Sequence, residues 1–357
     1  MYKRQGIGSP EAALRRLNIP HQNVFACEID KFAKQSYLEL NDPDTFYEDI
    51  TTRNHSEVEQ LDLYVAGFPC QAFSYAGKRK GFADETRGTL FFDVAEFIRV
   101  NQPNCFILEN VRGLVSHDKG RTFQTITDIL SNGGGSLNGQ VGLDTIDNGL
   151  GYHVYYKILN TKNFGIPQNR ERIFIVGFKN WREFRFPKEF PLDITLKDLL
   201  EYDVNEKYYL SQKMIDGFNR HKERHEDKGT GFKWQPKSGD DIANCLRANA
   251  ALCPTDNSVI VHNLHPRCGD PKKGGTGHLS KTDGIAYCLD AANSIAVERE
   301  QKIRRLTPLE TWRLQGFTDK EFWKAQKVNS DTQLYKQAGN TITVNVMVEL
   351  LKKIYLK

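Results

Sequence analysis

Short apolar runs alternate with helical patterns through the first 180 residues of the chain. Runs of about four to eight mostly apolar residues predict strands, and they lie at residues 23–27, 61–66, 105–108, 152–159 and 172–178. Apolar residues at helical spacing predict helices between the strands, near residues 9–17, 32–40 and 90–100. Strands separated by helices form β-α-β units, so the pattern predicts an α/β fold with a doubly wound, mostly parallel sheet and helices on both faces.

The regular pattern breaks off in the middle of the chain. Residues 184–300 contain Gly, Pro and Lys clusters and short apolar runs without strong periodicity, which predicts a second, smaller and irregular domain. Helical spacing returns at residues 308–314 and 341–355. The last helix has an apolar stripe that requires a partner, so we expect residues 301–357 to pack back onto the first domain, residues 1–183.

Composition and charge limit the class of protein. The 357 residues include 21 Phe and 14 Tyr, enough for a core, and no apolar run reaches the roughly 18 residues of a membrane helix. Seven dispersed cysteines do not form a disulfide scaffold, and no signal peptide begins the chain. These features favour a reducing, cytoplasmic compartment and no membrane contact.

The middle of the chain is more basic than the rest. The net charge is +4, and residues 207–281 contain 13 Lys and Arg against 8 Asp and Glu. A phosphate backbone favours such a segment. On charge alone, a solvated, loop-rich face explains it equally well.

Candidate chemistry follows two of the predicted strands. Cys70 lies just after the strand at 61–66, and Glu109 directly follows the strand at 105–108. Ligands of open α/β sheets bind beyond the carboxyl ends of strands, and a thiolate beside a carboxyl group suits attack on an electron-poor ring. Taken alone, a cysteine after a proline is more often an ordinary buried thiol. Arg170 and Arg172 suit a phosphate or a carbonyl, or else surface ion pairs.

Five short motifs follow one another along the chain. The first three are Phe-Pro-Cys-Gln at residues 68–71, Glu-Asn-Val at 109–111 and Gln-Asn-Arg-Glu-Arg at 168–172. The other two are Arg-Arg-Leu-Thr-Pro at 304–308 and Gln-Ala-Gly-Asn-Thr at 337–341. In this order the five motifs resemble those of the C5-cytosine DNA methyltransferase family of bacteria and phages. The resemblance covers residues 6–180 and 302–357, and it implies a Rossmann-like catalytic domain. The segment between corresponds to the family's target recognition domain.

The resemblance implies a mechanism for an S-adenosylmethionine-dependent DNA (cytosine-5)-methyltransferase. Cys70 adds to C6 of cytosine while Glu109 engages N3 and the exocyclic amine. C5 then takes the methyl group, and loss of the C5 proton expels the cysteine. Arg170 and Arg172 steady the carbonyl of the base and the adjacent backbone. The base must leave the duplex to reach the thiol.

The resemblance also implies the cofactor contacts. The turn Gly6-Ile7-Gly8 approaches the cofactor, Glu28 binds ribose hydroxyls, Ile29 packs on adenine, and Asp49 accepts from its amine. A helix cap is an equally good interpretation of Asp49 without the family. The full set is Gly6, Gly8, Glu28, Ile29, Asp49, Ile50, Pro69, Asn340 and Val344.

Double-stranded DNA is the expected partner, and residues 74–86 are expected to close over it. The candidate DNA contacts are Gln71, Ser74, Lys78, Arg79, Lys80, Arg247, Arg267, Lys272, Lys273 and Arg304. Which of them reach base edges stays open. The Cys and His residues of the middle region match no zinc spacing well, so no metal is expected. We expect a monomer, and a restriction endonuclease that acts on the same site without contact stays open.

The amino terminus departs from the family pattern. The family has an apolar strand before the glycine turn, whereas residues 1–5 read Met-Tyr-Lys-Arg-Gln, which does not suit a buried parallel strand. One hypothesis is that the true start is missing. Two alternative functions stay open, an RNA cytosine methyltransferase and a DNA-binding remnant without activity.

Overall fold

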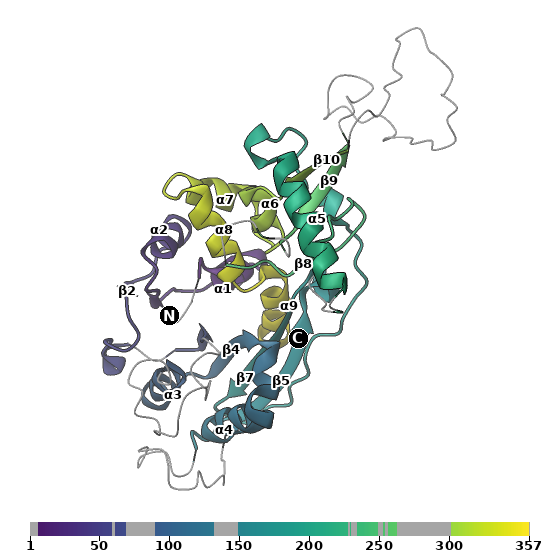
Figure 1. The fold of residues 1–357 in the computed structure, drawn as a ribbon. Helices are drawn as coiled ribbons and strands as arrows, with labels where there is room; N and C mark the ends of the chain where they lie inside the picture. The colour runs from purple at the N-terminus through teal and green to yellow at the C-terminus, as the bar shows by residue number, and fades with distance from the viewer. Residues whose placement is uncertain are drawn as a thin grey trace. The chain divides into compact units, whose positions relative to one another are not determined.

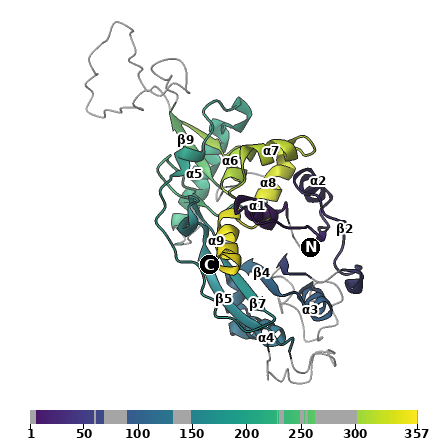
Figure 2. The ribbon, with the colours of Figure 1, turned by 180° about the vertical axis from the view of Figure 1, so that it is seen from behind.

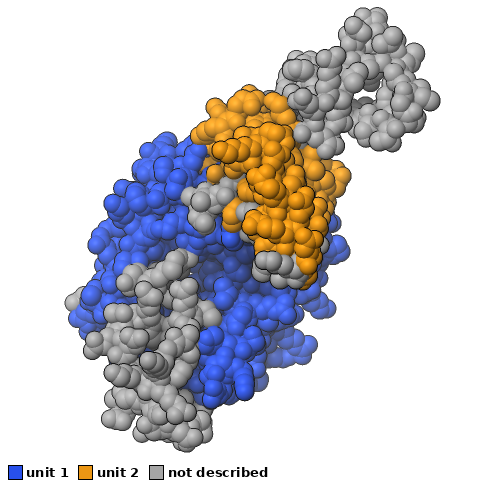
Figure 3. Space-filling model, in the orientation of Figure 1, with its two compact units in different colours: residues 1–194, 245–250, 311–357 blue, residues 195–244, 251–310 orange. Residues whose placement is uncertain are grey.

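The computed structural model describes residues 6–58, 61–68, 90–131, 149–227, 229, 234–248, 253, 256–262 and 301–356 (Figure 1). The chain forms two compact units (Figure 3). Unit 1 contains Met1–Ile194, Cys245–Ala250 and Thr311–Lys357, and unit 2 contains Thr195–Asn244 and Ala251–Glu310. The sequence predicts boundaries at residues 183 and 300, whereas the units divide at 194 and 310. Residues 1–5 lie outside the described residues, so the missing-strand hypothesis stays a prediction.

A four-stranded sheet with the order β3-β4-β7-β5 forms the centre of unit 1. β3 is parallel to β4, whereas β7 is antiparallel to both β4 and β5. β1 and β2 form a separate parallel pair. The strands are β1 (Phe25–Cys27), β2 (Thr45–Tyr47), β3 (Leu63–Gly67), β4 (Cys105–Val111), β5 (His153–Asn160) and β7 (Glu171–Phe178).

The predicted strand positions are confirmed, but a mostly parallel sheet is confirmed only in part. Residues 161–170 connect β5 to β7, and they contain only the 3-10 turn η4 (Thr161–Phe164) and the short strand β6 (Gln168–Asn169). A parallel crossover needs a dozen or more residues. The short connection therefore gives β5 and β7 opposite directions.

Helices cover both faces of this sheet. α3 (Leu90–Asn101) and α4 (Arg121–Leu130) share a buried apolar cluster with β3, β4 and β7, in which Phe106 and Leu108 of β4 are fully buried. Successive side chains of a strand point to opposite faces, so the alternate residues of β4 face the other side of the sheet. α1 (Ser9–Arg16) and α9 (Val344–Tyr355) pack together on the other side of the sheet (Figures 1 and 2). The doubly wound arrangement is thus present.

The carboxyl-terminal helices of unit 1 contact the amino-terminal ones. α9 buries the face that the sequence predicts, including Val344, Leu351 and Ile354, and it packs against α1. α2 (Lys31–Leu40) contacts both α7 (Asp319–Gln326) and α8 (Asp331–Asn340). α6 (Pro308–Arg313) begins in unit 2 and ends in unit 1, and the other 3-10 turns of unit 1 are η1 (His55–Glu57) and η3 (Arg112–Gly120).

Unit 2 has little regular structure among its described residues. β9 pairs with β10 in antiparallel fashion, and Trp234 is buried, with its indole N–H donating to Ser258 Oγ at 3.1 Å. The elements are η5 (Leu196–Leu199), η6 (Glu206–Tyr208), α5 (Gln212–Asp227), β8 (Ala243–Asn244), β9 (Ser258–His262) and β10 (Gln301–Arg305). Throughout the described part of the chain, every helix is too short or too polar to cross a membrane.

Candidate active site

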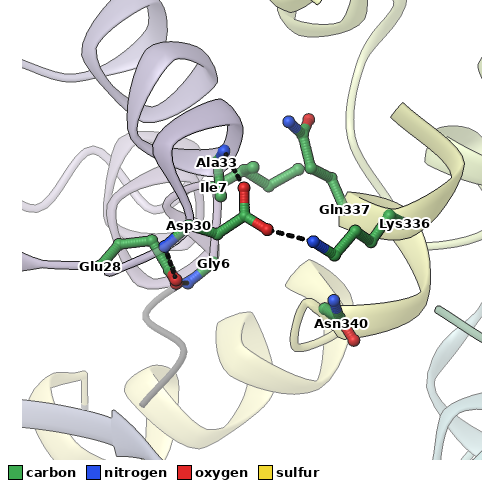
Figure 4. Close-up of a pocket in the computed structure, with 8 residues that line it drawn as sticks. All are labelled: Gly6, Ile7, Glu28, Asp30, Ala33, Lys336, Gln337 and Asn340. Carbon is green, nitrogen blue, oxygen red and sulfur yellow. Dashed lines mark hydrogen bonds and ion pairs between the residues drawn. The ribbon is translucent and has the colours of Figure 1, made fainter. Parts of the chain in front are cut away.

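A pocket in unit 1 opens between three parts of the chain that are distant in sequence (Figure 4). The turn before α1, the segment from β1 into α2, and the end of α8 contribute its walls. About 300 Å³ of space, partly open to solvent, lies between them. The lining residues are Gly6, Ile7, Glu28, Asp30, Ala33, Lys336, Gln337 and Asn340.

Glu28 is held rigidly at this pocket. Its side chain is almost fully buried, at 3% exposure. The backbone N–H of Gly6 donates to Oε2 at 3.1 Å, and the N–H of Asp30 donates to Oε1 at 3.0 Å. The carboxylate therefore joins the glycine turn to the segment after β1 and has a fixed orientation.

The glycine turn requires glycine for two reasons. Gly6 and Gly8 have φ values of 69° and 91°, in the left-handed region that side chains disfavour. A Cβ on Gly8 would also lie 2.3 Å from Nδ2 of Asn41. The backbone therefore packs closely against its protein neighbours at this point, and the predicted approach to a cofactor stays a prediction.

Asp30 and Lys336 form an ion pair at the pocket that the sequence pattern does not predict. Asp30 caps α2, with its Oδ1 accepting from the N–H groups of Phe32 and Ala33 at 3.0 and 3.1 Å. Its Oδ2 accepts from Nζ of Lys336 on α8. An aspartate before a helix is a recognisable cap signal, but nothing local indicates its partner 306 residues away.

Only part of the predicted cofactor set lines the pocket. Gly6, Glu28 and Asn340 do, whereas Gly8, Ile29, Asp49, Ile50 and Val344 do not. Asp49 instead accepts hydrogen bonds from the N–H and Oγ1 of Thr51, both at 2.9 Å. These bonds stabilise a turn, and the next helical element, η1, is capped by Asn54 and not by Asp49. Ile50 and Val344 are buried in the interior, while Ile29 is 36% exposed.

A second group of charged residues lies at the carboxyl end of β4. Glu109 Oε1 is 3.1 Å from Nε of Arg172, and both side chains are less than one-fifth exposed. In the β4–β7 ladder Glu109 lies opposite Phe174, two residues from Arg172. Residues in this diagonal relation share one face of the sheet, so the motif spacing brings the carboxylate and the guanidinium together.

Arg170 is buried, with 3% exposure, and contacts protein acceptors. Nη2 donates to the carbonyl oxygens of Gly339 and Thr341 at 3.2 and 2.9 Å, and Nη1 donates to the carbonyl of Leu246 at 3.3 Å. Burial lowers the pKa of Arg170, and the adjacent Arg172 lowers it further. This guanidinium binds the region around Asn340 to β6 and β7.

Arg304 is a correction to the predicted DNA contacts. Its side chain is 1% exposed and makes a bidentate pair with Glu310, with distances of 2.8 and 2.7 Å. A buried arginine paired in this way does not reach a phosphate. Arg247 is exposed.

Several predicted residues lie outside the described ranges. Within those ranges no group of three or more potential metal ligands occurs, and most of the Cys and His residues considered for a metal are not described. The other undescribed candidates are Pro69, Cys70, Gln71, Ser74, Lys78, Arg79, Lys80, Arg267, Lys272 and Lys273.

Comparison with known proteins supplies the family. The model of the family described as C-5 cytosine-specific DNA methylase matches residues 4–356. The type II methyltransferase M.HpaII of Haemophilus parainfluenzae is 40% identical, with 99% of this chain and 87% of that protein covered. The orphan methyltransferase M.SPRI of Bacillus phage SPR is 31% identical, with 98% and 95% covered.

Solved structures agree on the fold. The Dnmt2 methyltransferase of S. pombe has a TM-score of 0.63 at 18% identity, and the alignment covers 97% of this chain and 95% of that one. Dnmt2 of Spodoptera frugiperda, solved as a triple mutant, also has a TM-score of 0.63, at 17% identity. These likenesses confirm the Rossmann-like class. With the family model matching nearly every residue, the chain belongs to the C-5 cytosine-specific DNA methylase family.

Proposed function

We propose that this protein transfers a methyl group from S-adenosylmethionine to C5 of cytosine in duplex DNA. The observation that carries the proposal is the ion pair of Glu109 and Arg172 at the carboxyl end of β4, beside the strand that leads to Cys70. Ligands of open α/β sheets bind at such strand ends. The family description and the type II relatives favour DNA over RNA.

The register of β3 and β4 supports Cys70 as the nucleophile. Gly67 lies opposite Glu109 in the parallel ladder, and Nδ2 of Asn110 donates to the carbonyl of Phe68 at 2.8 Å. Cys70 follows Phe68 by two residues, a stretch that spans at most about 7 Å. Cys70 therefore follows closely in sequence on residues held against β4, which supports a shared site for Cys70 and Glu109.

In the proposed reaction the Cys70 thiolate forms a carbon–sulfur bond to C6 of cytosine. The electron pair of the 5,6 double bond moves towards C5, and Glu109 donates a proton or a hydrogen bond to N3 to stabilise the charge. The cofactor, when bound, supplies an electrophilic methyl group for C5. Loss of the C5 proton to a base restores the double bond and expels the thiolate. The target base must first leave the duplex.

The pocket residues fit an adenosyl cofactor. Glu28 offers a fixed, buried carboxylate for ribose hydroxyls, Asn340 offers an amide, and Ala33 adds a small apolar side chain to the wall. We propose that the Gly6–Gly8 turn, Glu28 and Asn340 hold the cofactor. For Ile29, Asp49, Ile50, Pro69 and Val344 the proposal rests on the family resemblance alone.

The two arginines have different proposed roles. Arg172 contacts Glu109 and is proposed to steady the carboxyl group and the base. Arg170 is a positioning residue in this proposal, since its guanidinium binds backbone carbonyls and lies in the interior.

A monomer in the cytoplasm and an endonuclease for the same site also remain proposals. Among the described residues, Cys27, Cys105, Cys245 and Cys253 form no disulfide bond, which suits a reducing compartment.

Transfer of a labelled methyl group to duplex DNA and to tRNA, side by side, tests the substrate. We expect label in duplex DNA only. Label in tRNA alone would support an RNA methyltransferase instead. DNA binding at saturating cofactor without any transfer would support an inactive remnant.

A further inference from the structure

A short segment from the middle of the chain belongs to unit 1. Cys245–Ala250 groups with that unit, although the residues on both sides group with unit 2. Oε1 of Gln168 accepts from the N–H of Leu246 at 3.1 Å, and Nε2 of Gln168 donates to the carbonyl of Leu314 at 2.7 Å. The segment is thus attached to β6 by a hydrogen bond at Leu246, and Gln168 is itself held by Leu314.

A close backbone contact fixes the same segment from its other side. Gly339, near the end of α8, lies so near to residues 247 and 248 that a Cβ on it would be 2.3 Å from the carbonyl oxygen of Arg247. It would also lie 2.4 Å from the nitrogen of Ala248. The segment therefore lies between α8 and the two arginines of the 168–172 motif.

The Cys245 sulfur contacts both of these arginines. Nη1 of Arg170 lies 3.4 Å from Sγ, and Nη2 of Arg172 lies 3.6 Å from it. Sγ also lies 3.6 Å from the carbonyl oxygen of Leu246, to which the thiol donates. Sulfur is a weak acceptor, but here it faces two positively charged donors, and hydrogen bonds to charged groups are the stronger ones.

These contacts form a continuous chain that ends on the catalytic carboxyl group. Arg172 uses Nη2 for the sulfur and Nε for Glu109. The two contacts involve different atoms of one planar guanidinium, whose donors have a fixed geometry. An acceptor at Sγ therefore restricts the rotation of the plane and keeps Nε directed at Glu109.

We propose that Cys245 is a positioning residue of the catalytic site, whose sulfur orients Arg172 and through it Glu109. The proposal rests on the proposed methyltransferase function. Cys245 lies in the stretch of sequence that corresponds to the family's target recognition domain. The proposal therefore gives this stretch a role in methyl transfer in addition to reading DNA. The property that matters is a hydrogen-bond acceptor at this position. Serine has a hydroxyl acceptor and should therefore preserve the function of Cys245, whereas alanine and valine have no acceptor and should not.

The test compares Cys245→Ala, Cys245→Val and Cys245→Ser in single-turnover methylation of duplex DNA by the full chain. Valine fills the volume of the thiol without an acceptor, so it separates packing from hydrogen bonding. We expect the Ala and Val variants to slow the methyl-transfer step about 10- to 100-fold, the factor for losing a hydrogen bond to a charged group. The affinities for DNA and cofactor, measured by titration, should change less than about twofold, and the Ser variant should retain most of the rate.

A double-mutant cycle with Arg172→Gln separates positioning from a structural role. If Cys245 acts through Arg172, then Cys245→Ala adds little to the loss caused by Arg172→Gln. Cys253→Ala is the matched control, since this second partly exposed cysteine belongs to unit 2, and it should keep the wild-type rate.

Two results would overturn the proposal. One is a wild-type rate in both Cys245→Ala and Cys245→Val. The other is an additive loss in the double mutant together with no rescue by serine, which would indicate a packing role. An inactive wild-type chain would instead contradict the proposed function, so the two failures are distinguishable.

Discussion

Glu109 and Arg172 illustrate how the site depends on side chains whose partners are distant in sequence. Each lies on its own strand, and the antiparallel β4–β7 pairing brings them to the same face. Both are largely buried, so each fixes the other in one orientation at the sheet's edge. A carboxyl group held in this way is placed to exchange a proton with a ring nitrogen.

Replacement of Glu109 by glutamine tests this assignment at the level of one proton. Glutamine keeps the size and a hydrogen-bonding amide but does not exchange the proton. We expect the methyl-transfer step to slow about 10²–10⁴-fold, the usual contribution of acid catalysis, with DNA affinity little changed. Single-turnover kinetics measure the step. Glu96→Gln, which removes an exposed carboxylate paired with Arg99 on α3, is the control and should react at the wild-type rate.

The buried pair of Arg304 and Glu310 leads to a prediction about stability. Arg304→Met leaves a buried carboxylate without its partner, which costs about 3–5 kcal/mol, so the urea midpoint should fall clearly. Arg304→Met/Glu310→Met should recover much of that loss. Measured for the folded double mutant, the slope of log Kd against log salt for DNA should equal that of the wild type.

Exposed Arg247 provides the contrast. If Arg247 neutralises one phosphate, Arg247→Gln should lower the slope of log Kd against log salt by about one. A lower slope in the Arg304 double mutant would restore Arg304 to the DNA contacts.

At the scale of elements, the pocket depends on where helices begin and end. The start of α2 and the end of α8 meet through Asp30 and Lys336, and Gln337 adds a hydrogen bond from its Nε2 to the carbonyl of Phe32 at 3.0 Å. These contacts join parts of the chain about 300 residues apart. They hold the pocket wall without any regular strand pairing.

The Asp30 cap gives a pH dependence with a defined sign. Burial alone would raise the pKa of Asp30, but hydrogen bonds from Lys336 and from the N–H of Ala33 outweigh burial and lower it. A carboxyl group with a lowered pKa stabilises the folded state above its unfolded pKa of about 4, and this stabilisation is lost as the pH falls through the folded-state pKa.

Asp30→Asn keeps a capping oxygen but removes the charge. Its melting temperature should lie below that of the wild type at about pH 6, and the difference should shrink towards about pH 3. Thermal melts at several pH values measure this. Lys336→Met should reduce the same pH dependence, whereas a difference that is constant with pH would contradict the assigned charge interaction.

The close contact between α8 and residues 247–248 gives a steric prediction. Gly339→Ala places a methyl group against backbone atoms of Arg247 and Ala248, an overpacking that costs about 1–3 kcal/mol. We expect a lower urea midpoint and slower methyl transfer. Gly217→Ala on α5 is the matched control, because nothing lies within 4 Å of its new Cβ, and it should stabilise the helix by up to about 1 kcal/mol.

At the scale of the whole molecule, the sequence predicted the positions of the strands better than their directions. Apolar runs mark buried strands, so β3, β4, β5 and β7 lie where they were expected. Such runs carry no information on direction. The antiparallel direction of β7 follows from the short connection after β5. The order of the family motifs carries no information on strand direction either.

Part of the site was predictable because its chemistry follows a strand or a turn, or because a motif contains the residue, as for Asn340. Glu109 and the Gly6–Gly8 turn were found this way. Cys245, Asp30 and Lys336 were missed as site residues because their partners lie between 73 and 306 residues away. Arg304 was assigned to DNA because its motif shows a charge but not whether the side chain faces the interior.

The central claim is tested most directly by the product that the chain forms on duplex DNA. Wild-type protein and Cys70→Ala are incubated with cofactor carrying an isotopically labelled methyl group, and the nucleosides of the digested DNA are separated by mass spectrometry. We predict labelled 5-methylcytosine from the wild type and none from Cys70→Ala, which should still bind the DNA. Equal amounts of 5-methylcytosine from both proteins, or label on a different atom of the base, would contradict the account.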